Sequence, residues 1–413
     1  MASSSSVKRT NPIHMAIEDL SEDLLMEILL RLPVKSLLRF KSVCKNWYAL
    51  LQTPSFIYRH HDRAASIAAD ENTDCLLVKR SLEGGEGGVA LSFVPNETPT
   101  EDIDISSTGL DIKQLQILGP CNGVVCLTRF ALNSTIVICN PSMREFRVLP
   151  QPSYKNDHMS LLGFGYNPFA DDYKVVRFGM MTMDLNNWDG SIDERVEIYD
   201  LSTDLWREVD AESPIESGFH CCHYSYVSWN WDCFWYAYRR DGDGGGAVIM
   251  AFSMSDEEFE EIPVPEVCLL DHHSEKKLFV LNDSLAMVIY PKWWSNPLWF
   301  QPEDFMSKSF DIWIMHEDGD EDDVEVSWTK KFTVGPFQGL EWALGFRQSD
   351  EFLLESNYGQ MISYNLSTGE RKEYQVHDKE LQGRFPPPNL QVLLYTGSLV
   401  SVKRRNEHDG PAE

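Results

Sequence analysis

The chain has 413 residues, which is long enough for two or three domains at about 150 residues each. Its composition, with 43% hydrophobic and 24% charged residues, is that of a globular protein and excludes a disordered chain. The balance of 36 Lys and Arg against 64 Asp and Glu gives a formal net charge of -28. Nucleic acids and anionic membranes are bound through surplus cations, so we expect neither as a partner, whereas a basic protein partner stays open.

The sequence carries no signal that would direct the chain out of the cell. No stretch approaches the roughly 18 apolar residues of a transmembrane helix, and the serine-rich residues 1–16 lack the apolar core of a signal peptide. The nine cysteines are scattered without the spacing of a disulfide framework, which is typical of a reducing compartment. We therefore expect a cytoplasmic or nuclear protein with disordered tails at residues 1–16 and 406–413.

Residues 17–60 have the periodicity of a small helical domain. Ser21 is expected to cap a first helix, Pro33 to end it and open a second, and Pro54 to end a third. The apolar residues of the first helix fall on one stripe, namely Leu24, Leu25, Ile28, Leu29 and Leu32. Three helices of this size cannot hold a large core alone, so the stripe either binds a partner or packs on the rest of the chain.

From about residue 70 to 405 the pattern changes to short β-strands bounded by turn residues. One phrase, a strand followed by a polar turn and a returning strand with an aromatic residue, recurs at 138–146, 198–206, 251–259 and 363–371. We expect a further copy with an acidic insertion at 314–328 and a fainter one at 91–95. A period of roughly 50 residues is typical of a kelch-like propeller blade, so we predict about six blades. Residues 392–395 and 399–402 would supply the strands that close the ring.

Motifs of catalysis and metal binding are weak. The sequence contains no HExxH, GxSxG, CxxC or phosphate-binding GxxxxGK[ST] motif. The run at 220–223, His-Cys-Cys-His, would place adjacent ligands on opposite faces of a strand, which does not favour zinc. Two stretches, 241–252 and 318–329, begin like calcium loops but lack the final glutamate. We expect no metal, no cofactor and no enzymatic activity.

Two groups of aromatic residues are candidates for packing or binding. The group at 229–238 is predicted to pack between blades. The second group lies in the long, proline-punctuated stretch 291–308, where exposed aromatic residues make good anchors for a protein target. Its members, our candidate target-binding residues, are Trp293, Trp294, Trp299 and Phe300. The acidic tract 317–325 is either a solvated loop or a patch that attracts a basic partner.

The segment 19–56 resembles the F-box. Its pattern L-x-x-D-L-L-x-E-I-L-x-R-L-P-V-K-S-L-x-R-F-K-x-V-C-K-x-W fits that family closely, although Ser21 stands where the family usually has proline. The resemblance implies binding to a Skp-family adaptor and, through it, to a cullin-RING ubiquitin ligase. The resemblance implies that the adaptor-facing or packing positions are Leu20, Leu24, Ile28, Leu32, Pro33, Leu37, Val43, Cys44 and Trp47, together with Ser21 at the position that departs from the family pattern.

The remainder resembles the plant F-box-associated domain, and its order of phrases is similar to that of the S-locus F-box proteins. The phrases that carry this likeness include those at 121–126, 163–166, 172–176, 196–199, 311–315, 327–331 and 363–366. The resemblance implies an α+β multidomain protein in which a three-helix F-box at 17–60 precedes an all-β propeller at 70–405. The implied function is substrate recognition for a ubiquitin ligase, with basic S-locus ribonucleases as the implied target of that branch. The alternatives are a propeller enzyme with a helical cap and a scaffold that binds without promoting degradation.

Overall fold

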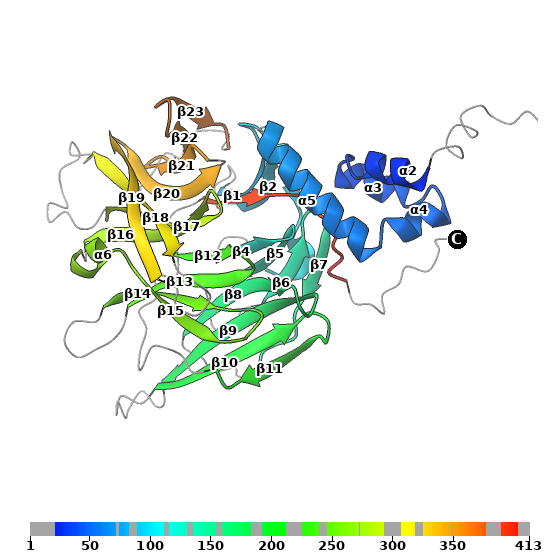
Figure 1. Cartoon of the computed structure of the whole chain (residues 1–413), viewed down its shortest axis with the longest axis horizontal. Helices are drawn as coiled ribbons and strands as arrows, with labels where there is room; N and C mark the ends of the chain where they lie inside the picture. Colours follow the sequence, from blue (N-terminus) through cyan, green and yellow to red (C-terminus); the bar gives the residue numbers. More distant parts are fainter. Residues whose placement is uncertain are drawn as a thin grey trace, which may run out of the picture.

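The computed structural model places a helical module, α2 to α5, at one end of a β-propeller (Figure 1). Among the residues it describes, no helix is both long and apolar enough to cross a membrane. The described residues are 21–71, 74–81, 89–110, 115–129, 135–153, 159–182, 192–211, 225–238, 246–271, 273–292, 307–318, 325–347, 349–376 and 390–403.

The helical module begins with the three short helices that the sequence predicts. They are α2 (Glu22–Leu29), α3 (Val34–Phe40) and α4 (Lys45–Leu50). The Ser21 hydroxyl accepts a hydrogen bond from the Leu24 amide at 3.3 Å, which confirms the predicted cap. The expectation that Pro54 ends the third helix is wrong, because α4 already ends at Leu50 and Pro54 opens a fourth, long helix, α5 (Pro54–Glu71). Proline suits this position because the first turn of a helix needs no amide donor there.

The described part of the propeller consists of six four-stranded sheets, which confirms the predicted number of blades. The six innermost strands, β24, β4, β8, β12, β16 and β20, surround the centre in this order. A 3-10 turn, η1 (Ser106–Thr108), and a short helix, α6 (Glu266–Leu270), lie in connections between blades. From the centre outwards, blade one contains β24 (Gln391–Tyr395), β1 (Cys75–Ser81), β2 (Val89–Val94) and β3 (Glu101–Ile103), and blade two contains β4 (Leu115–Cys121), β5 (Val124–Arg129), β6 (Val137–Asn140) and β7 (Glu145–Val148). Blade three contains β8 (Met159–Asn167), β9 (Asp172–Thr182), β10 (Ile192–Asp200) and β11 (Leu205–Val209), and blade four contains β12 (Tyr226–Trp229), β13 (Asp232–Tyr238), β14 (Ala247–Phe252) and β15 (Phe259–Pro263). Blade five contains β16 (Ser274–Leu281), β17 (Ser284–Pro291), β18 (Lys308–Asp318) and β19 (Glu325–Phe337), and blade six contains β20 (Leu340–Arg347), β21 (Glu351–Ser356), β22 (Met361–Asn365) and β23 (Arg371–Tyr374).

The ring is closed by pairing the last strand with the first. Strand β24 is antiparallel to β1, with Leu76 opposite Leu394 and Val78 opposite Val392. The prediction that 392–395 closes the ring is therefore confirmed. The prediction of a second closing strand at 399–402 is wrong, because residues 396–403 form no strand and instead run beneath the helical module.

The recurring phrase is the hairpin between the third and fourth strands of a blade. In four blades the seventh residue of the phrase has a positive φ, between 55° and 76°, and these residues are Arg144, Asp204, Glu257 and Gly369. The four turns therefore place a left-handed residue at the same position of the phrase, which agrees with the alignment of the phrases without gaps. The expected copies at 314–328 and 91–95 are the β18–β19 and β2–β3 hairpins.

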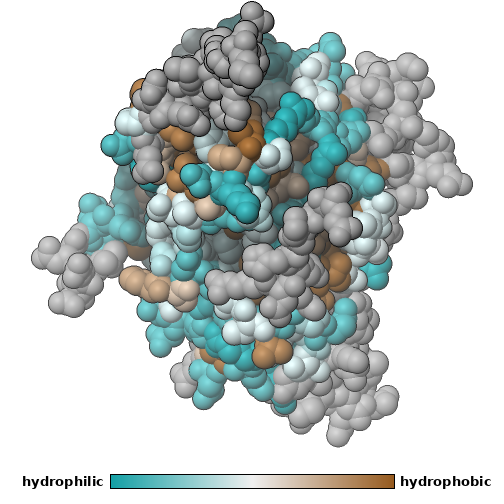
Figure 2. Space-filling model, turned by 90° about the vertical axis from the view of Figure 1, so that its right-hand side faces the viewer, coloured by the Kyte–Doolittle hydropathy of each residue, from teal (hydrophilic) through white to brown (hydrophobic). Residues whose placement is uncertain are grey.

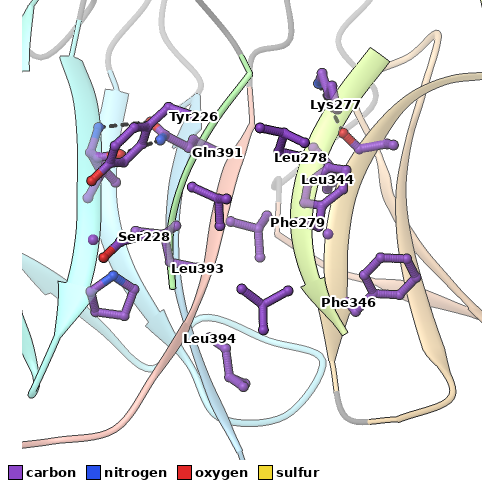
Figure 3. A pocket seen from close by; sticks show the side chains of 18 of the residues that line it. Tyr226, Ser228, Lys277, Leu278, Phe279, Leu344, Phe346, Gln391, Leu393 and Leu394 are labelled. Carbon is purple, nitrogen blue, oxygen red and sulfur yellow. Dashed lines mark hydrogen bonds between the residues drawn. The ribbon is translucent and has the colours of Figure 1, made fainter. Parts of the chain in front are cut away.

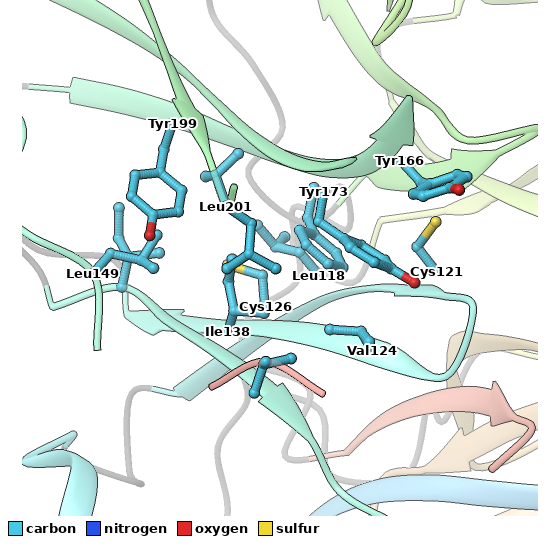
Figure 4. Close-up of a cluster of buried hydrophobic side chains, with 14 residues drawn as sticks. Leu118, Cys121, Val124, Cys126, Ile138, Leu149, Tyr166, Tyr173, Tyr199 and Leu201 are labelled. Atoms are coloured by element: carbon cyan, nitrogen blue, oxygen red, sulfur yellow. The ribbon is translucent and has the colours of Figure 1, made fainter. Parts of the chain in front are cut away.

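Hydrophobic side chains fill the spaces between neighbouring blades. Figure 4 shows one such cluster, in which Tyr166 and Tyr173 of the third blade face Cys121 and Cys126 of the second. Burial raises the pKa of the Cys126 thiol well above its usual range, so this cysteine acts as a small core residue. Most of the aromatic group at 229–238 also packs between blades, as predicted, because Trp235 and Tyr236 belong to the clusters on opposite sides of blade four. Trp231 is the exception and is exposed.

Two glycines of β8 allow the third and fourth blades to approach closely. A Cβ atom at Gly165 would lie 2.1 Å from the carbonyl oxygen of Trp231, and one at Gly163 would lie 2.6 Å from the Cys233 sulfur. The close approach lets the Tyr226 hydroxyl donate to the Phe164 carbonyl at 3.1 Å and accept from its amide at 3.0 Å. The two glycines are thus required by the packing of blade four.

We predict that Gly165→Ala lowers the free energy of unfolding by about 3 kcal/mol, because the new methyl group meets backbone that cannot move aside cheaply. Gly246→Ala is the matched control, since nothing lies within 4 Å of a Cβ atom there, and its effect should stay within about 0.5 kcal/mol. Urea-induced unfolding of the two variants measures the difference. Equal stabilities would show that the two blades are not in the close contact described.

Candidate protein-binding site

The helical module presents large hydrophobic side chains to solvent. Leu24 and Ile28 on α2 are 50% and 43% exposed, and Val43, in the turn before α4, is 59% exposed. Tyr48 on α4 is also exposed. Figure 2 views this end of the molecule and shows hydrophobic side chains interspersed with hydrophilic ones. Several such residues on one small module are typical of a protein-binding surface.

The other side of the same helices forms the core of the module. Leu29 and Leu30 are buried with Val34, Leu37 and Phe56. The apolar stripe predicted for the first helix is therefore divided, with one edge in the core and the other in solvent. Both interpretations of the stripe therefore apply in part: Leu24 and Ile28 are free to bind a partner, and Leu29 packs within the chain.

The structure separates the predicted adaptor-binding residues by exposure. Leu37 is completely buried, so it can support the surface from within but cannot contact a partner directly. Leu32 and Trp47 are half-buried, and the Trp47 ring lies edge-on to Phe40 at 5.4 Å between ring centres. Leu20 lies outside the described residues. The exposed members are Ser21, Leu24, Ile28, Pro33, Val43 and Cys44.

The predicted target-binding residues, Trp293, Trp294, Trp299 and Phe300, lie outside the described residues, as does the run at 220–223. In the part of the chain that the structure describes, no group of three or more His, Cys, Asp or Glu side chains is arranged to hold a metal ion. The exposed surface of the helical module is thus the candidate site that the described residues form.

Helix α5 holds the module together through polar contacts with α2. Arg59 and Arg63 form ion pairs with Glu27 at 3.6 and 3.2 Å. The buried His60 ring lies 2.8 Å, through Nε2, from the carbonyl oxygen of Leu32 and packs on Phe56. Burial lowers the pKa of His60, which favours the neutral ring in this position.

The end of the chain attaches the module to the propeller. Leu399 is buried in the helical core, although it follows the closing strand at the far end of the sequence. The Asn140 side-chain amide, in blade two, donates to the carbonyl oxygens of Ser398 and Val400 at 3.1 and 2.7 Å. The segment 396–403 therefore lies between the two domains and contacts both. The sequence does not reveal this role, because it predicts that residues 399–402 form a strand that closes the ring.

A second attachment joins α5 to blade three. The Tyr58 hydroxyl lies 2.7 Å from that of Tyr166, and both hydroxyls donate to the Asp171 carboxylate. Burial and the neighbouring carboxylate raise the pKa of the Tyr58 hydroxyl, which keeps it protonated as a donor. Two separate attachments restrict rotation of the module on the propeller.

Comparison with known families identifies both domains. Residues 17–59 match the F-box domain, and residues 88–402 match the F-box associated beta propeller domain. Because the second match covers most of the chain, the protein belongs to the F-box proteins that carry an F-box-associated propeller.

Individual relatives from Arabidopsis thaliana agree with this assignment. The chain is 24% identical to F-box protein CPR1, with 93% of this chain and 91% of that protein covered. A second F-box protein is 23% identical over 87% of this chain and 88% of its own length. A third is 28% identical, but there the alignment covers 60% of this chain and only 61% of that protein. Among solved structures, apo AztD from Citrobacter koseri aligns with a TM-score of 0.37 and 8% identity over 79% of this chain and all of that one, and adds nothing to the assignment.

We predict that Leu399→Ala lowers the stability of the helical module by about 2–5 kcal/mol, because it leaves a cavity in the core of the module. Hydrogen exchange of the backbone amides in α2, α3 and α4 should become faster. Leu205→Ala, at a position 65% exposed on a blade edge, is the control and should change stability by less than about 0.5 kcal/mol. Unchanged exchange in the helices of Leu399→Ala would contradict the attachment.

Proposed function

We propose that this protein is the substrate-recognition subunit of a Skp-cullin-F-box ubiquitin ligase. Its F-box docks a Skp-family adaptor, and its propeller holds a protein target. The exposed row of Leu24, Ile28 and Val43 on a module of F-box sequence carries this proposal. The chain itself performs no covalent chemistry; it acts by holding a lysine of the target near the ubiquitin-conjugating enzyme.

The attachment of the F-box to the propeller suits such a role. Proximity accelerates a transfer only when the partners keep a fixed separation and orientation. The contacts at Leu399 and at Tyr58 restrict motion between the two binding surfaces. A bound target would therefore be presented to the ligase in one orientation.

The face of the propeller away from the F-box is the better candidate for the target. The module contacts the side of the tight turns, such as the β6–β7 turn at Met143 and the β8–β9 turn at Asp171. Longer connections leave the opposite ends of the strands, among them those between β9 and β10, β17 and β18, and β23 and β24. Such connections are the usual place for binding residues on a rigid scaffold. The aromatic residues of 293–300 belong to the β17–β18 connection, and their role stays a prediction.

The net charge of -28 supports a basic target, because opposite charge accelerates encounter. A basic S-locus ribonuclease of the pollen self-incompatibility system is one target of this kind, and its assignment stays part of the proposal.

We predict that the double variant Leu24→Asp, Ile28→Asp binds a plant Skp-family adaptor at least 100-fold more weakly than the wild type. Two aliphatic anchors contribute about 1.5–3 kcal/mol each when buried, and carboxylates cannot be buried there without a partner. Val148→Asp, Leu205→Asp is the matched control, since both residues are exposed on blade edges. Calorimetric titration measures the affinities. Undiminished binding by the Leu24, Ile28 variant would contradict adaptor docking through this surface.

The degradative role has its own test. We expect the same Leu24, Ile28 double variant to bind its target normally but to lengthen the half-life of that target in cells, because the ligase is no longer recruited. A target half-life that is equal with both proteins would instead indicate a scaffold. Turnover of a small substrate by the purified chain would favour a propeller enzyme.

A further inference from the structure

The propeller encloses a central cavity of about 850 Å³. Its walls are the inner strands β4, β12, β16, β20 and β24, and Ala65 of α5 borders it. Figure 3 shows apolar side chains, among them Phe279, Leu393 and Leu394, between these strands. A cavity of this size with mostly apolar walls fits the description of a small-molecule binding site.

Two lysines that line the cavity lack the partners that a buried cation normally has. Lys277 of β16 is 9% exposed, and its ammonium donates one hydrogen bond, to the Ala343 carbonyl at 3.0 Å. The half-buried Lys79 of β1 donates one hydrogen bond, to the Leu115 carbonyl at 2.8 Å. An ammonium has three N–H donors, so each lysine retains unused ones. Neither lysine has a carboxylate within ion-pair distance among the described residues.

Three other buried cations of the propeller do have such partners. Lys174 pairs with Glu257 at 2.6 Å, Arg177 with Glu197 at 2.6 Å, and Lys308 with Glu341. Burial of a cation without a charged partner lowers the stability of the fold. A lysine of this kind beside a cavity therefore indicates a ligand-binding role more than a structural one.

Two carboxylates act on Lys277, and neither is among the residues that line the cavity. Glu275 on the same strand and the buried Glu355 of β21 interact with it over a longer range, and Glu355 also acts on Lys79. The Trp342 ring lies 5.5 Å from the Lys277 ammonium and is shared with Lys308. Despite the two carboxylates, burial lowers the pKa of Lys277 to about 8, and burial also lowers that of Lys79. The ammonium at this site is therefore incompletely stabilised by the protein alone.

The two ends of the cavity carry side chains of opposite charge. Asp74 precedes β1 and Asp283 follows β16, and both line the cavity. Asp74 is five residues from Lys79 and Asp283 is six residues from Lys277, so each lies roughly 15 Å or more along the chain from its lysine. Cations thus line one end and carboxylates the end that Ala65 borders.

We propose that the central cavity binds a small amphipathic carboxylate. Its carboxylate group accepts a hydrogen bond from Lys277, at the end of the cavity that Lys79 also lines, and its apolar body lies against Phe279, Leu393 and Leu394. The carboxylates at the other end exclude the opposite orientation. This site is separate from the adaptor-binding surface and does not depend on it.

Calorimetric titration of the full-length chain with decanoate tests the proposal, with decanol and decylamine as probes of matched length. We expect saturable binding of decanoate, at least tenfold tighter than that of either control. Lys277→Met should weaken decanoate binding at least tenfold and leave decanol binding within twofold. Lys330→Met, which removes an exposed lysine, should change neither. Leu394→Trp, which fills the cavity, should abolish binding of all three probes, and thermal unfolding checks that each variant is folded.

The protonation of Lys277 gives an independent readout. Because the ammonium form binds the carboxylate, decanoate affinity should fall roughly tenfold between pH 7 and pH 9, across the pKa of about 8. Lys277→Met should reduce this pH dependence. The proposal is wrong if decanoate does not bind the folded wild type, if decanol binds as tightly, or if Lys277→Met leaves decanoate affinity and its pH dependence unchanged.

Discussion

The pairing of β24 with β1 is the interaction on which the rest of this structure depends. It closes the ring, and without it the first blade would have three strands and an exposed inner edge. The same strand carries Gln391, whose side-chain amide exchanges two hydrogen bonds with the Ile117 backbone of the second blade, at 2.9 and 2.6 Å. The strand that closes the ring therefore also joins blade one to blade two.

The same closure determines the geometry between the two binding surfaces. Beyond β24 the chain continues through Gly397 and places Leu399 among the F-box helices. The F-box thus has a core that the propeller completes. Adaptor docking and target holding, proposed here as the two halves of the function, share a rigid connection made of packed side chains.

The sequence was informative where structure is set locally. The capped helix at Ser21, the stop at Pro33 and the repeated turn with its positive φ at Arg144 depend on residues a few positions apart. It could not show what depends on distant contacts. Periodicity placed Leu24 and Leu29 on one stripe but could not say which edge other elements cover. The same limit hid Leu399 in the helical core and the lack of an ion pair at Lys277, since a missing partner is visible only when all neighbours are placed.

The position of Leu399 also bears on how the protein is made. Synthesis proceeds from the N-terminus, so the F-box helices leave the ribosome long before the residue that completes their core. A nascent or prematurely terminated chain presents Leu24 and Ile28 on helices that are not yet fully packed. A chain that ends before residue 399 therefore carries a less stable adaptor-binding module, which places a product without a closed propeller at a disadvantage for the adaptor.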